Sequence, residues 1–155
     1  MPDMLVKLYN LPDSRPTYAA LAAQNITLRR ALAPETGKII DWIRQHFGDG
    51  WASEAACSLA RTPAALFVAH KDKTLLGFAC YDAVCRNFFG PTGVDESCRG
   101  QGIGKALLLR TLEQMRDDGY GYAIIGWVGP AAFYEKAVGA SIIEDSEPGV
   151  YRGLL

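Results

Sequence analysis

The chain has 155 residues, of which 49% are hydrophobic and 21% charged, and its 16 basic and 17 acidic side chains give a formal net charge of -1. This length suits one domain that buries about 70% of the surface of its unfolded chain. The apolar content excludes a disordered regulator, and the balanced charge argues against a nucleic-acid binder that neutralises phosphates. No apolar stretch approaches the roughly 20 residues that cross a bilayer, so we expect no membrane contact.

The four cysteines, at positions 57, 80, 85 and 98, form no CxxC pair and no cluster with histidine. Zinc sites need ligands at short recurring spacings, so the sequence predicts no metal site. A disulfide between Cys80 and Cys85 is an alternative, but the rest of the chain is unlike a small secreted scaffold. Residues 1–15 lack the pattern of a signal peptide. We therefore interpret all four as free thiols and expect a cytoplasmic protein.

The first sixty residues predict a strand, a helix, a second strand and two further helices, at residues 4–9, 15–24, 26–32, 38–47 and 51–60. Ser14 is placed to be the N-cap of the first helix. Pro34 suits the start of the second helix, whose isoleucines and aromatic residues recur at helical spacing. Gly48 and Gly50 separate it from the third.

The middle of the chain predicts three strands, at residues 65–69, 75–81 and 87–94, with a hairpin turn between the first two. Pro91 lies within the third of these strands. Because proline cannot donate a hydrogen bond to a strand ladder, we expect an irregularity or an unpaired edge there.

After Val94 the apolar period becomes helical. We predict a helix, a buried strand, a short helix and two closing strands, at residues 102–117, 122–128, 130–138, 141–143 and 150–154. The inward face of the long helix would carry Ile103, Leu107, Leu108, Leu112 and Met115, and Gly119 would follow its last turn. The alternation of strands and helices predicts an α+β, or mixed α/β, domain around one twisted sheet.

The most informative stretch runs from Val94 to Lys105 and reads VDESCRGQGIGK. A strand ends, a short loop follows, and a glycine-rich turn opens a long helix. Glycines allow several N–H groups to converge on one anion, and a helix start adds unpaired donors and about half a positive charge. Arg99 and Lys105 add formal positive charge. Physically, this stretch predicts a cradle for phosphate or pyrophosphate.

Two familiar phosphate motifs do not fit this stretch. A Walker loop needs Ser or Thr after Gly-Lys, but Ala106 follows here, and the dinucleotide fingerprint needs GxGxxG, whereas residues 100–104 read GxGxG. On spacing alone, a tight turn without a ligand stays open. An enzyme that uses the same cradle for another phosphate ligand also stays open.

The pattern Arg99-x-x-Gly102-x-Gly104, between a strand ending at Val94 and a leucine-rich helix, resembles the acyl-CoA pyrophosphate loop of the GNAT superfamily of N-acetyltransferases. Further along, residues 133–136 (FYEK), followed by Gly-Ala, look like the final helix and turn of that family. The order of predicted elements agrees from about residue 26 to residue 155, so the resemblance covers most of the chain.

The resemblance implies a single twisted, mostly antiparallel sheet with helices on both faces. It implies a GNAT-like domain at residues 26–155, with residues 1–25 as an N-terminal strand and helix packed on it. It also implies acetyl-CoA as co-substrate, no metal, and transfer of the acetyl group to a primary amine of a small molecule or peptide by direct attack in a ternary complex.

Carried over position by position, the resemblance assigns the cofactor-binding residues Val94, Arg99, Gly100, Gln101, Gly102, Ile103, Gly104 and Lys105. Val94 would hold the pantetheine arm through its main chain. Tyr134 occupies the position of the general acid that protonates the leaving thiolate; the alternative is a tyrosine that only packs against the sheet. Family members often carry an Asn after the buried strand, and residues 126–130 (GWVGP) contain none.

The general base is not marked by the sequence. Asp82, Glu54, Glu96 and His70 are candidates, and a water chain held by main chain and Thr92 is an equal alternative, so we assign none of them. Trp42, Phe47 and Trp51 bracket the link between two early helices, which borders the acceptor site in the resembling family; they are either core or pocket residues. Cys98 beside the loop has no histidine partner, which argues against a nucleophilic role.

Two further expectations concern partners. A non-catalytic acyl-CoA sensor or interaction module is the alternative to an enzyme, although retention of Tyr134 beside an intact loop favours the enzyme. We expect no nucleic-acid partner. The segment at residues 4–24 either packs on the sheet edge or forms a dimer contact, and we expect a homodimer.

Overall fold

Seven strands form one sheet in the order β2-β3-β4-β5-β6-β1-β7. The computed structural model describes residues 1–155. The strands are β1 (Met4–Lys7), β2 (Thr27–Arg30), β3 (Leu66–Lys71), β4 (Thr74–Tyr81), β5 (Phe88–Val94), β6 (Tyr122–Ile125) and β7 (Ser141–Ile142). The helices are α1 (Arg15–Ala23), α2 (Thr36–Phe47), α3 (Asp49–Leu59), α4 (Ile103–Asp117) and α5 (Ala131–Val138).

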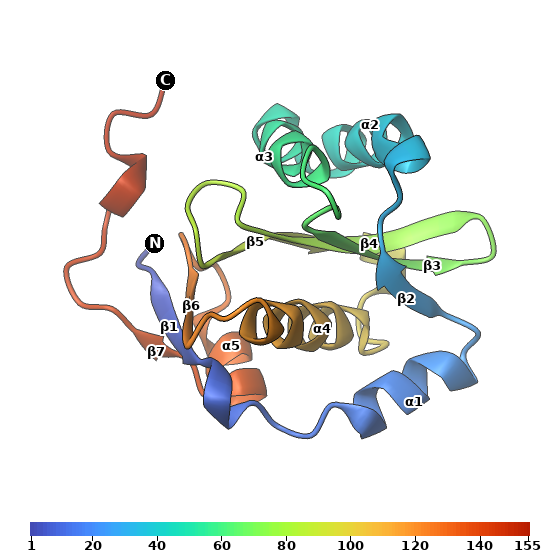
Figure 1. Ribbon diagram of the computed structural model, residues 1–155, viewed down its shortest axis with the longest axis horizontal. Helices are drawn as coiled ribbons and strands as arrows, with labels where there is room; N and C mark the ends of the chain where they lie inside the picture. Colours follow the sequence, from blue (N-terminus) through green and yellow to red (C-terminus); the bar gives the residue numbers. More distant parts are fainter.

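The arrangement confirms the expected fold class. Every pair of neighbouring strands is antiparallel except β5 and β6, which are parallel. Helices α2 and α3 cover one face of the sheet, and α4 lies on the other face with α1 and α5 (Figure 1).

Both faces of the sheet are buried because β3 and β4 are apolar at nearly every position. On β3, Phe67 and Ala69 belong to the core under α4, whereas Leu66 and Val68 belong to the core under α2 and α3. This alternation follows from the two-residue period of a strand. Each large apolar side chain that is fully buried contributes about 1.5–3 kcal/mol, so the middle of the sheet is a rigid base for its edges.

Helix α4 has the inward face that its periodicity predicts. Ile103, Leu107, Leu108, Leu112 and Met115 are each at most 1% exposed. The helix is therefore anchored along its whole length against the sheet, and its first turn has a fixed position beside the end of β5.

Strands β5 and β6 pair only over a short length, at Phe88 with Ile124 and at Phe89 with Ile125. Beyond that point β5 continues to Val94, while β6 ends. The predicted strand at residues 122–128 was therefore too long. The chain turns away after Ile125 because Trp127 takes a positive φ of 46°, which no strand accommodates. The divergence leaves a gap in the sheet that other parts of the chain line.

The N-terminal strand takes a place that the sequence did not indicate. β1 lies within the sheet, antiparallel to both β6 and β7. The predicted closing strand at residues 150–154 was wrong, since the chain forms a short 3-10 turn at Gly149–Tyr151 instead. The position next to β6 is already occupied by β1. The division into an extension at residues 1–25 and a domain at residues 26–155 stays a prediction.

None of the helices combines the length and the apolar content that a membrane crossing requires.

Candidate active site

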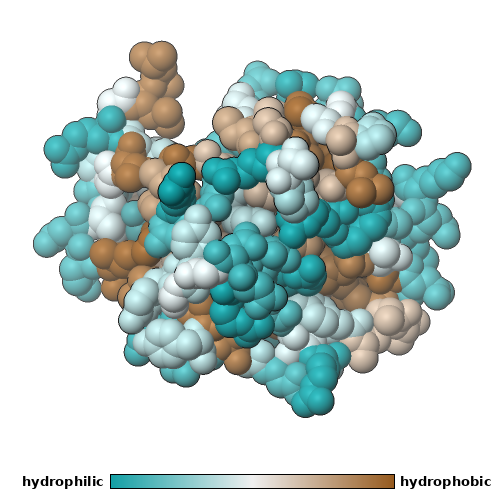
Figure 2. All heavy atoms as spheres, in the orientation of Figure 1, coloured by the Kyte–Doolittle hydropathy of each residue, from teal (hydrophilic) through white to brown (hydrophobic).

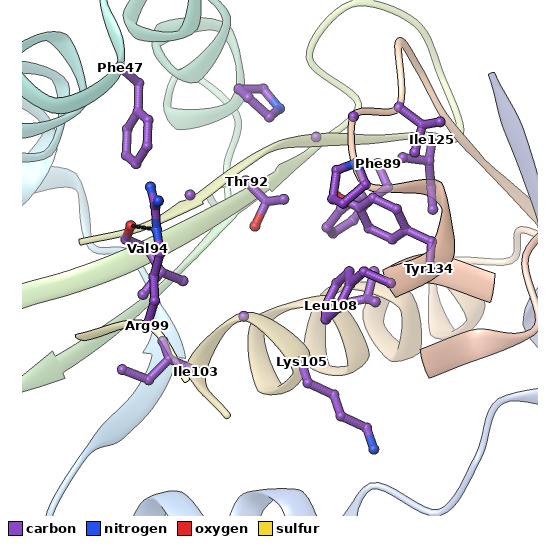
Figure 3. Close-up of a pocket in the computed structure, with 18 of the residues that line it drawn as sticks. Phe47, Phe89, Thr92, Val94, Arg99, Ile103, Lys105, Leu108, Ile125 and Tyr134 are labelled. Carbon is purple, nitrogen blue, oxygen red and sulfur yellow. Dashed lines mark hydrogen bonds between the residues drawn. The ribbon is translucent and has the colours of Figure 1, made fainter. Parts of the chain in front are cut away.

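The gap between β5 and β6 opens into a cavity of about 710 Å³. Its walls come from β5, from the turn into α4, from the segment after β6 and from α5. In Figure 3 the turn beside Val94 and Arg99 lies at one end, and Tyr134, Phe89 and Ile125 lie at the other. A single space therefore connects the glycine-rich turn with the tyrosine of α5.

Local hydrogen bonds shape the turn after β5. The amide of Asp95 donates to the carbonyl of Leu76 (2.8 Å), and the carboxylate of Asp95 accepts from the amide of Ser97 (2.9 Å). Gly100 and Gly102 then take φ values of +82° and +85°, which L side chains rarely adopt. The chain can thus reverse direction within a few residues and enter α4 beside the end of β5.

The start of α4 presents free amides to the cavity. Its first helical hydrogen bond runs from the amide of Ala106 to the carbonyl of Gly102 (3.0 Å), so the amides of Ile103, Gly104 and Lys105 have no acceptor in the helix. Ile103, Gly104 and Lys105 all line the cavity. These donors and the helix dipole together favour an anion at this end.

The charged side chains that line the cavity, Arg99 and Lys105, are both positive and both exposed. The guanidinium of Arg99 donates to the carbonyl of Val94 (3.4 Å), which holds it at the end of β5 (Figure 3). Lys105 extends away from Tyr134 and Thr92 in the same view. The loop end of the cavity is therefore positively charged.

Nearly all sequence-predicted cofactor residues meet at this cavity. Val94, Arg99, Gly100, Gly102, Ile103, Gly104 and Lys105 line it, as does Tyr134. Gln101 does not, and its carbonyl accepts a hydrogen bond from the side chain of Gln24 (3.4 Å). Gln101 thus lies on the side of the turn that faces α1.

The irregularity expected at Pro91 is confirmed. The pairing of β4 with β5 shifts register between Ala79 and Tyr81, opposite this point, and Gly90 has a φ of +118°. Gly90 and Pro91 both line the cavity. The bulge turns the middle of β5 toward the space in which a ligand would lie.

Gly93 must be a glycine because an aromatic ring occupies the space of its side chain. A Cβ atom at this position would lie 2.5 Å from Cζ of Phe47. Phe47 and Trp51 line the cavity, whereas Trp42 packs on Phe78 with ring centroids 6.3 Å apart. Two of the three early aromatic residues therefore line the cavity, and the third, half-buried, only packs against the core under α2 and α3.

Tyr134 lies at the end of the cavity away from the glycine-rich turn and is only 7% exposed. Burial raises the pKa of Tyr134 to about 12, so its phenol keeps its proton at neutral pH. Phe89 packs edge-on against its ring, with centroids 6.4 Å apart. The hydroxyl makes no hydrogen bond within the protein and is available to a ligand.

The wall opposite β5 is held by segments far apart in the sequence. The amide of Trp127 donates to the carboxylate of Asp3 (3.0 Å), and the amide of Val128 donates to the carbonyl of Pro2 (2.9 Å). The ring of Trp127 packs on Tyr151, with centroids 4.5 Å apart. No sequence motif indicates these contacts, because the residues that make them lie far apart in the sequence and follow no shared pattern.

None of the four candidates for the general base lines this cavity. Asp82 accepts from the amide of Asn87 and the hydroxyl of Tyr120 (2.8 and 2.9 Å), and His70 bonds to the carbonyl of Asp72, so both are structural. The remaining two, Glu54 and Glu96, do not line it either.

Thr92 does line the cavity, and its hydroxyl donates a hydrogen bond to the carbonyl of Phe78 (3.0 Å). Cys98 also lines it, with only the Ser97 hydroxyl near its sulfur, at 3.6 Å. All four cysteines are free thiols in the structure. No carboxylate or imidazole therefore faces the space where reactants would meet.

Comparisons with known proteins agree with this geometry. The family model described as an acetyltransferase (GNAT) domain matches residues 62–137, from before β3 to the end of α5. No match was found among the curated proteins. The chain belongs to the GNAT superfamily.

Solved structures share the fold. The chain is similar to the GCN5-related glucosamine N-acetyltransferase region of a fungal multi-domain GH3 β-N-acetylglucosaminidase, with a TM-score of 0.76 and 16% identity over 92% of this chain and 19% of that one. A GCN5-related N-acetyltransferase from Sphaerobacter thermophilus gives a TM-score of 0.69 and 17% identity, over 92% of this chain and 48% of that one. The GNAT family N-acetyltransferase YhbS from Escherichia coli in complex with CoA gives a TM-score of 0.50 and 21% identity, over 62% of this chain and 59% of that one. The chain thus spans about half or less of the length of the first two.

Proposed function

We propose that this chain transfers an acetyl group from acetyl-CoA to a primary amine of a small molecule or peptide, by direct attack in a ternary complex. The observation that carries the proposal is the continuity of the cavity, which joins the positively charged turn at Gly100–Gly104 to the free phenol of Tyr134. Family membership and a CoA-bound structural neighbour support the same cofactor.

The turn would bind the diphosphate of the coenzyme. Free amides at the start of α4 and the guanidinium of Arg99 supply donors and positive charge. From there the pantetheine arm would follow the exposed main chain of β5 at Val94, and the thioester would lie near the bulge at Gly90. An amide N–H of β5 here would polarise the thioester carbonyl.

The reaction balances without a covalent enzyme intermediate. The amine nitrogen attacks the carbonyl carbon, a C–N bond forms, and the C–S bond to coenzyme A breaks. The amine loses one proton, and the leaving sulfur gains one. Holding both reactants in one cavity would supply much of the acceleration.

Tyr134 would stabilise the leaving sulfur by donating a hydrogen bond. Its raised pKa, about 12, lies well above the value of about 8.5 typical of a thiol, so complete transfer of its proton to a free thiolate is unfavourable. The phenol therefore acts best as a donor while charge develops on sulfur, and the proton lost by the amine finally neutralises the thiol. Water beside Thr92 would carry that proton, since no side-chain base lines the cavity.

A second candidate function is a non-catalytic acyl-CoA sensor. The absence of a carboxylate or imidazole from the larger cavity favours it, because many proton transfers need such a group. Both functions use the same cofactor site, so binding alone does not separate them.

Release of free thiol from acetyl-CoA, measured against a panel of amines, tests the proposal. We expect amine-dependent thiol release, and we expect Tyr134→Phe to lower kcat by about 100-fold while it leaves the affinity for coenzyme A within about twofold. Phe133→Leu is a useful control, since Phe133 lines the same cavity but has no proton to donate.

Three outcomes would count against this account. Tight binding of coenzyme A without amine-dependent thiol release would favour the sensor. Normal turnover by Tyr134→Phe would contradict the role of Tyr134 as a donor to the leaving sulfur, and would leave the rest of the proposal standing. Stabilisation by ATP or NAD, but not by coenzyme A, would assign the turn to another phosphate ligand.

A further inference from the structure

A second cavity, of about 290 Å³, lies on the side of α3 and the C-terminal segment. Five aromatic side chains line it, those of Trp51, Phe88, Phe89, Trp127 and Tyr151. Figure 2 shows a notch at the top of the molecule, between the C-terminal segment and the helices above the sheet. The residues of this cavity come from both sides of that notch, so the cavity is assembled from distant parts of the chain.

Glu54 is the only residue with an acidic or basic side chain among those that line this cavity. It lies half-buried on α3, and no donor or cation pairs with it; burial alone raises the pKa of Glu54. Burial and the negative charge of Glu54 raise the pKa of Tyr151 to about 12, so that phenol stays neutral. Met1 also lines the cavity, and its terminal ammonium pairs with Glu147.

The two cavities adjoin. Trp51, Gly90 and Trp127 line both of them, so the smaller cavity opens on the bulge of β5. Glu54 lines only the smaller cavity, and Tyr134 lines only the larger one. The carboxylate therefore lies outside the space in which the amine would meet the thioester, and a role in binding suits it better than a role as base.

We propose that the smaller cavity binds a second, cationic group of the acceptor, so that the acceptor is a diamine whose two nitrogens are joined by an apolar chain. One nitrogen is held as an ammonium by Glu54 and the aromatic walls, and the other reaches the bulge as the nucleophile. This inference rests on the proposed function, because it describes the acceptor of that same site.

Charge and wall chemistry together select this class. An ammonium in a partly desolvated site gains a charge-assisted hydrogen bond to a carboxylate and attraction to the faces of Trp and Tyr rings. A neutral acceptor would bury Glu54 further without a partner, and an acidic acceptor would be repelled. The apolar stretch between the cavities, at Phe89 and Pro91, suits the methylene chain between two nitrogens.

The test compares diamines with monoamines of the same chain length, from diaminopropane to diaminooctane and from propylamine to octylamine. Binding to the protein saturated with coenzyme A is measured by calorimetry, and acetylation is measured by thiol release. For at least one chain length, we expect the diamine to bind about tenfold or more tightly than its monoamine, the discrimination expected of one charge-assisted hydrogen bond.

Glu54→Gln tests the charge of Glu54 without changing its packing, because it keeps the size of the side chain and removes its charge. We expect it to abolish the preference for the diamine, to weaken binding of the monoamine less than binding of the diamine, and to leave the affinity for coenzyme A within about twofold. Glu144→Gln, an exposed position that lines neither cavity, is the matched control and should keep the preference.

Equal affinity for diamines and monoamines at every length would overturn the inference. So would an equal loss of both affinities in Glu54→Gln, which would indicate a structural role for Glu54. If the diamine preference appears in calorimetry but no amine is acetylated, the smaller cavity is a cation site as inferred, and the proposed catalytic function fails instead. The binding and turnover readouts thus fail separately.

Discussion

The two walls of the larger cavity are built in opposite ways. One wall runs without interruption from β5 through the glycine-rich turn to α4, so its residues are neighbours in the sequence. The other wall, at residues 126–130, is held in place by Asp3 and by Tyr151, more than a hundred residues apart from each other. A local wall can be identified from a motif, and an assembled wall cannot, because its partners carry no common pattern.

The difference has a consequence for function. The local wall carries positive charge and free amides, which suit an anionic cofactor. The assembled wall carries Trp127 and adjoins the smaller cavity with Glu54, where the acceptor would bind. In the proposed function, cofactor binding would therefore depend on a short motif, whereas acceptor choice would depend on segments that can vary independently.

The largest effect should come from a negative charge in the local wall. Gly104→Asp places a carboxylate at the start of α4, where a Cβ atom meets nothing closer than 3.7 Å, so the fold tolerates it. Repulsion of a diphosphate at about 4 Å, in a partly screened site, is worth about 4 kcal/mol, or roughly a 1000-fold loss of affinity for coenzyme A. Calorimetric titration with coenzyme A checks it.

Gly37→Asp is the matched control for this change. Gly37 lies in the first turn of α2, and nothing lies within 4 Å of its Cβ position. We expect unchanged coenzyme A affinity in the control. Unchanged affinity in Gly104→Asp as well would mean that the turn binds no anion, and the cofactor assignment would fall.

Breaking the assembled wall should cost stability. Asp3→Ala leaves the amide of Trp127 without its carboxylate acceptor, and we expect the free energy of unfolding to fall by about 2 kcal/mol. Urea unfolding measures the change. Asp3→Asn, which keeps an oxygen acceptor, should recover most of the loss, and the exposed Asp117→Ala should change stability by less than about 0.5 kcal/mol. Equal effects of Asp3→Ala and Asp117→Ala would show that the N-terminal contact does not hold the wall.

Ionisation of Tyr134 should lower the stability of the folded protein at alkaline pH. Its pKa in the folded state, about 12, lies above the ordinary value of 10.0, so the folded state holds the phenol proton more tightly than the unfolded chain does. This contribution is complete below about pH 10 and is lost as the pH rises through about 12. Tyr134→Phe cannot ionise, so from about pH 9 to about pH 11 it should lose about 1 kcal/mol less than the unchanged protein.

Unfolding by urea at the two pH values measures this difference. Tyr122→Phe, which changes an exposed tyrosine on β6, is the control and should follow the unchanged protein. If Tyr134→Phe loses stability as steeply as the control does, the phenol is not buried in solution as it is in the structure.

The smallest effects should separate the two faces of the turn. Lys105 lines the cavity as an exposed charge, so Lys105→Ala should weaken coenzyme A binding by only about three- to fivefold. Gln101 faces α1, and Gln101→Ala should change binding by less than about twofold. A larger effect at Gln101 than at Lys105 would mean that the ligand approaches the turn from the other side.

Much of the fold was predictable because local patterns agree with the tertiary structure. The five apolar residues of α4 point inward as their spacing requires, and the hairpin at β3 and β4 follows from strand alternation around a polar turn. Pro91 marked the bulge in β5 for a local reason, since proline lacks an N–H. These features depend on residues that lie close together in the sequence.

Other features were missed where a distant segment decided the conformation. The apolar run at residues 122–128 predicts one long strand, yet Asp3 captures the amide of Trp127 and ends β6 early. Residues 150–154 have the composition of a strand, but β1 already occupies the position beside β6. The choice between core and pocket for Trp42, Phe47 and Trp51 also depended on neighbours from β4 and β5.

The sequence by itself determined the glycine-rich turn, the amphipathic helix behind it and the position of Tyr134, because each rests on backbone geometry and side-chain period within a short segment. Only the tertiary structure decided which residues line the proposed acceptor site, since the second cavity joins α3, the segment after β6 and the C-terminal turn. Glu54 looks like a solvated helix residue in the sequence. Enclosure by aromatic side chains from three remote segments makes it an unpaired carboxylate in a pocket, and long-range packing alone could bring that about.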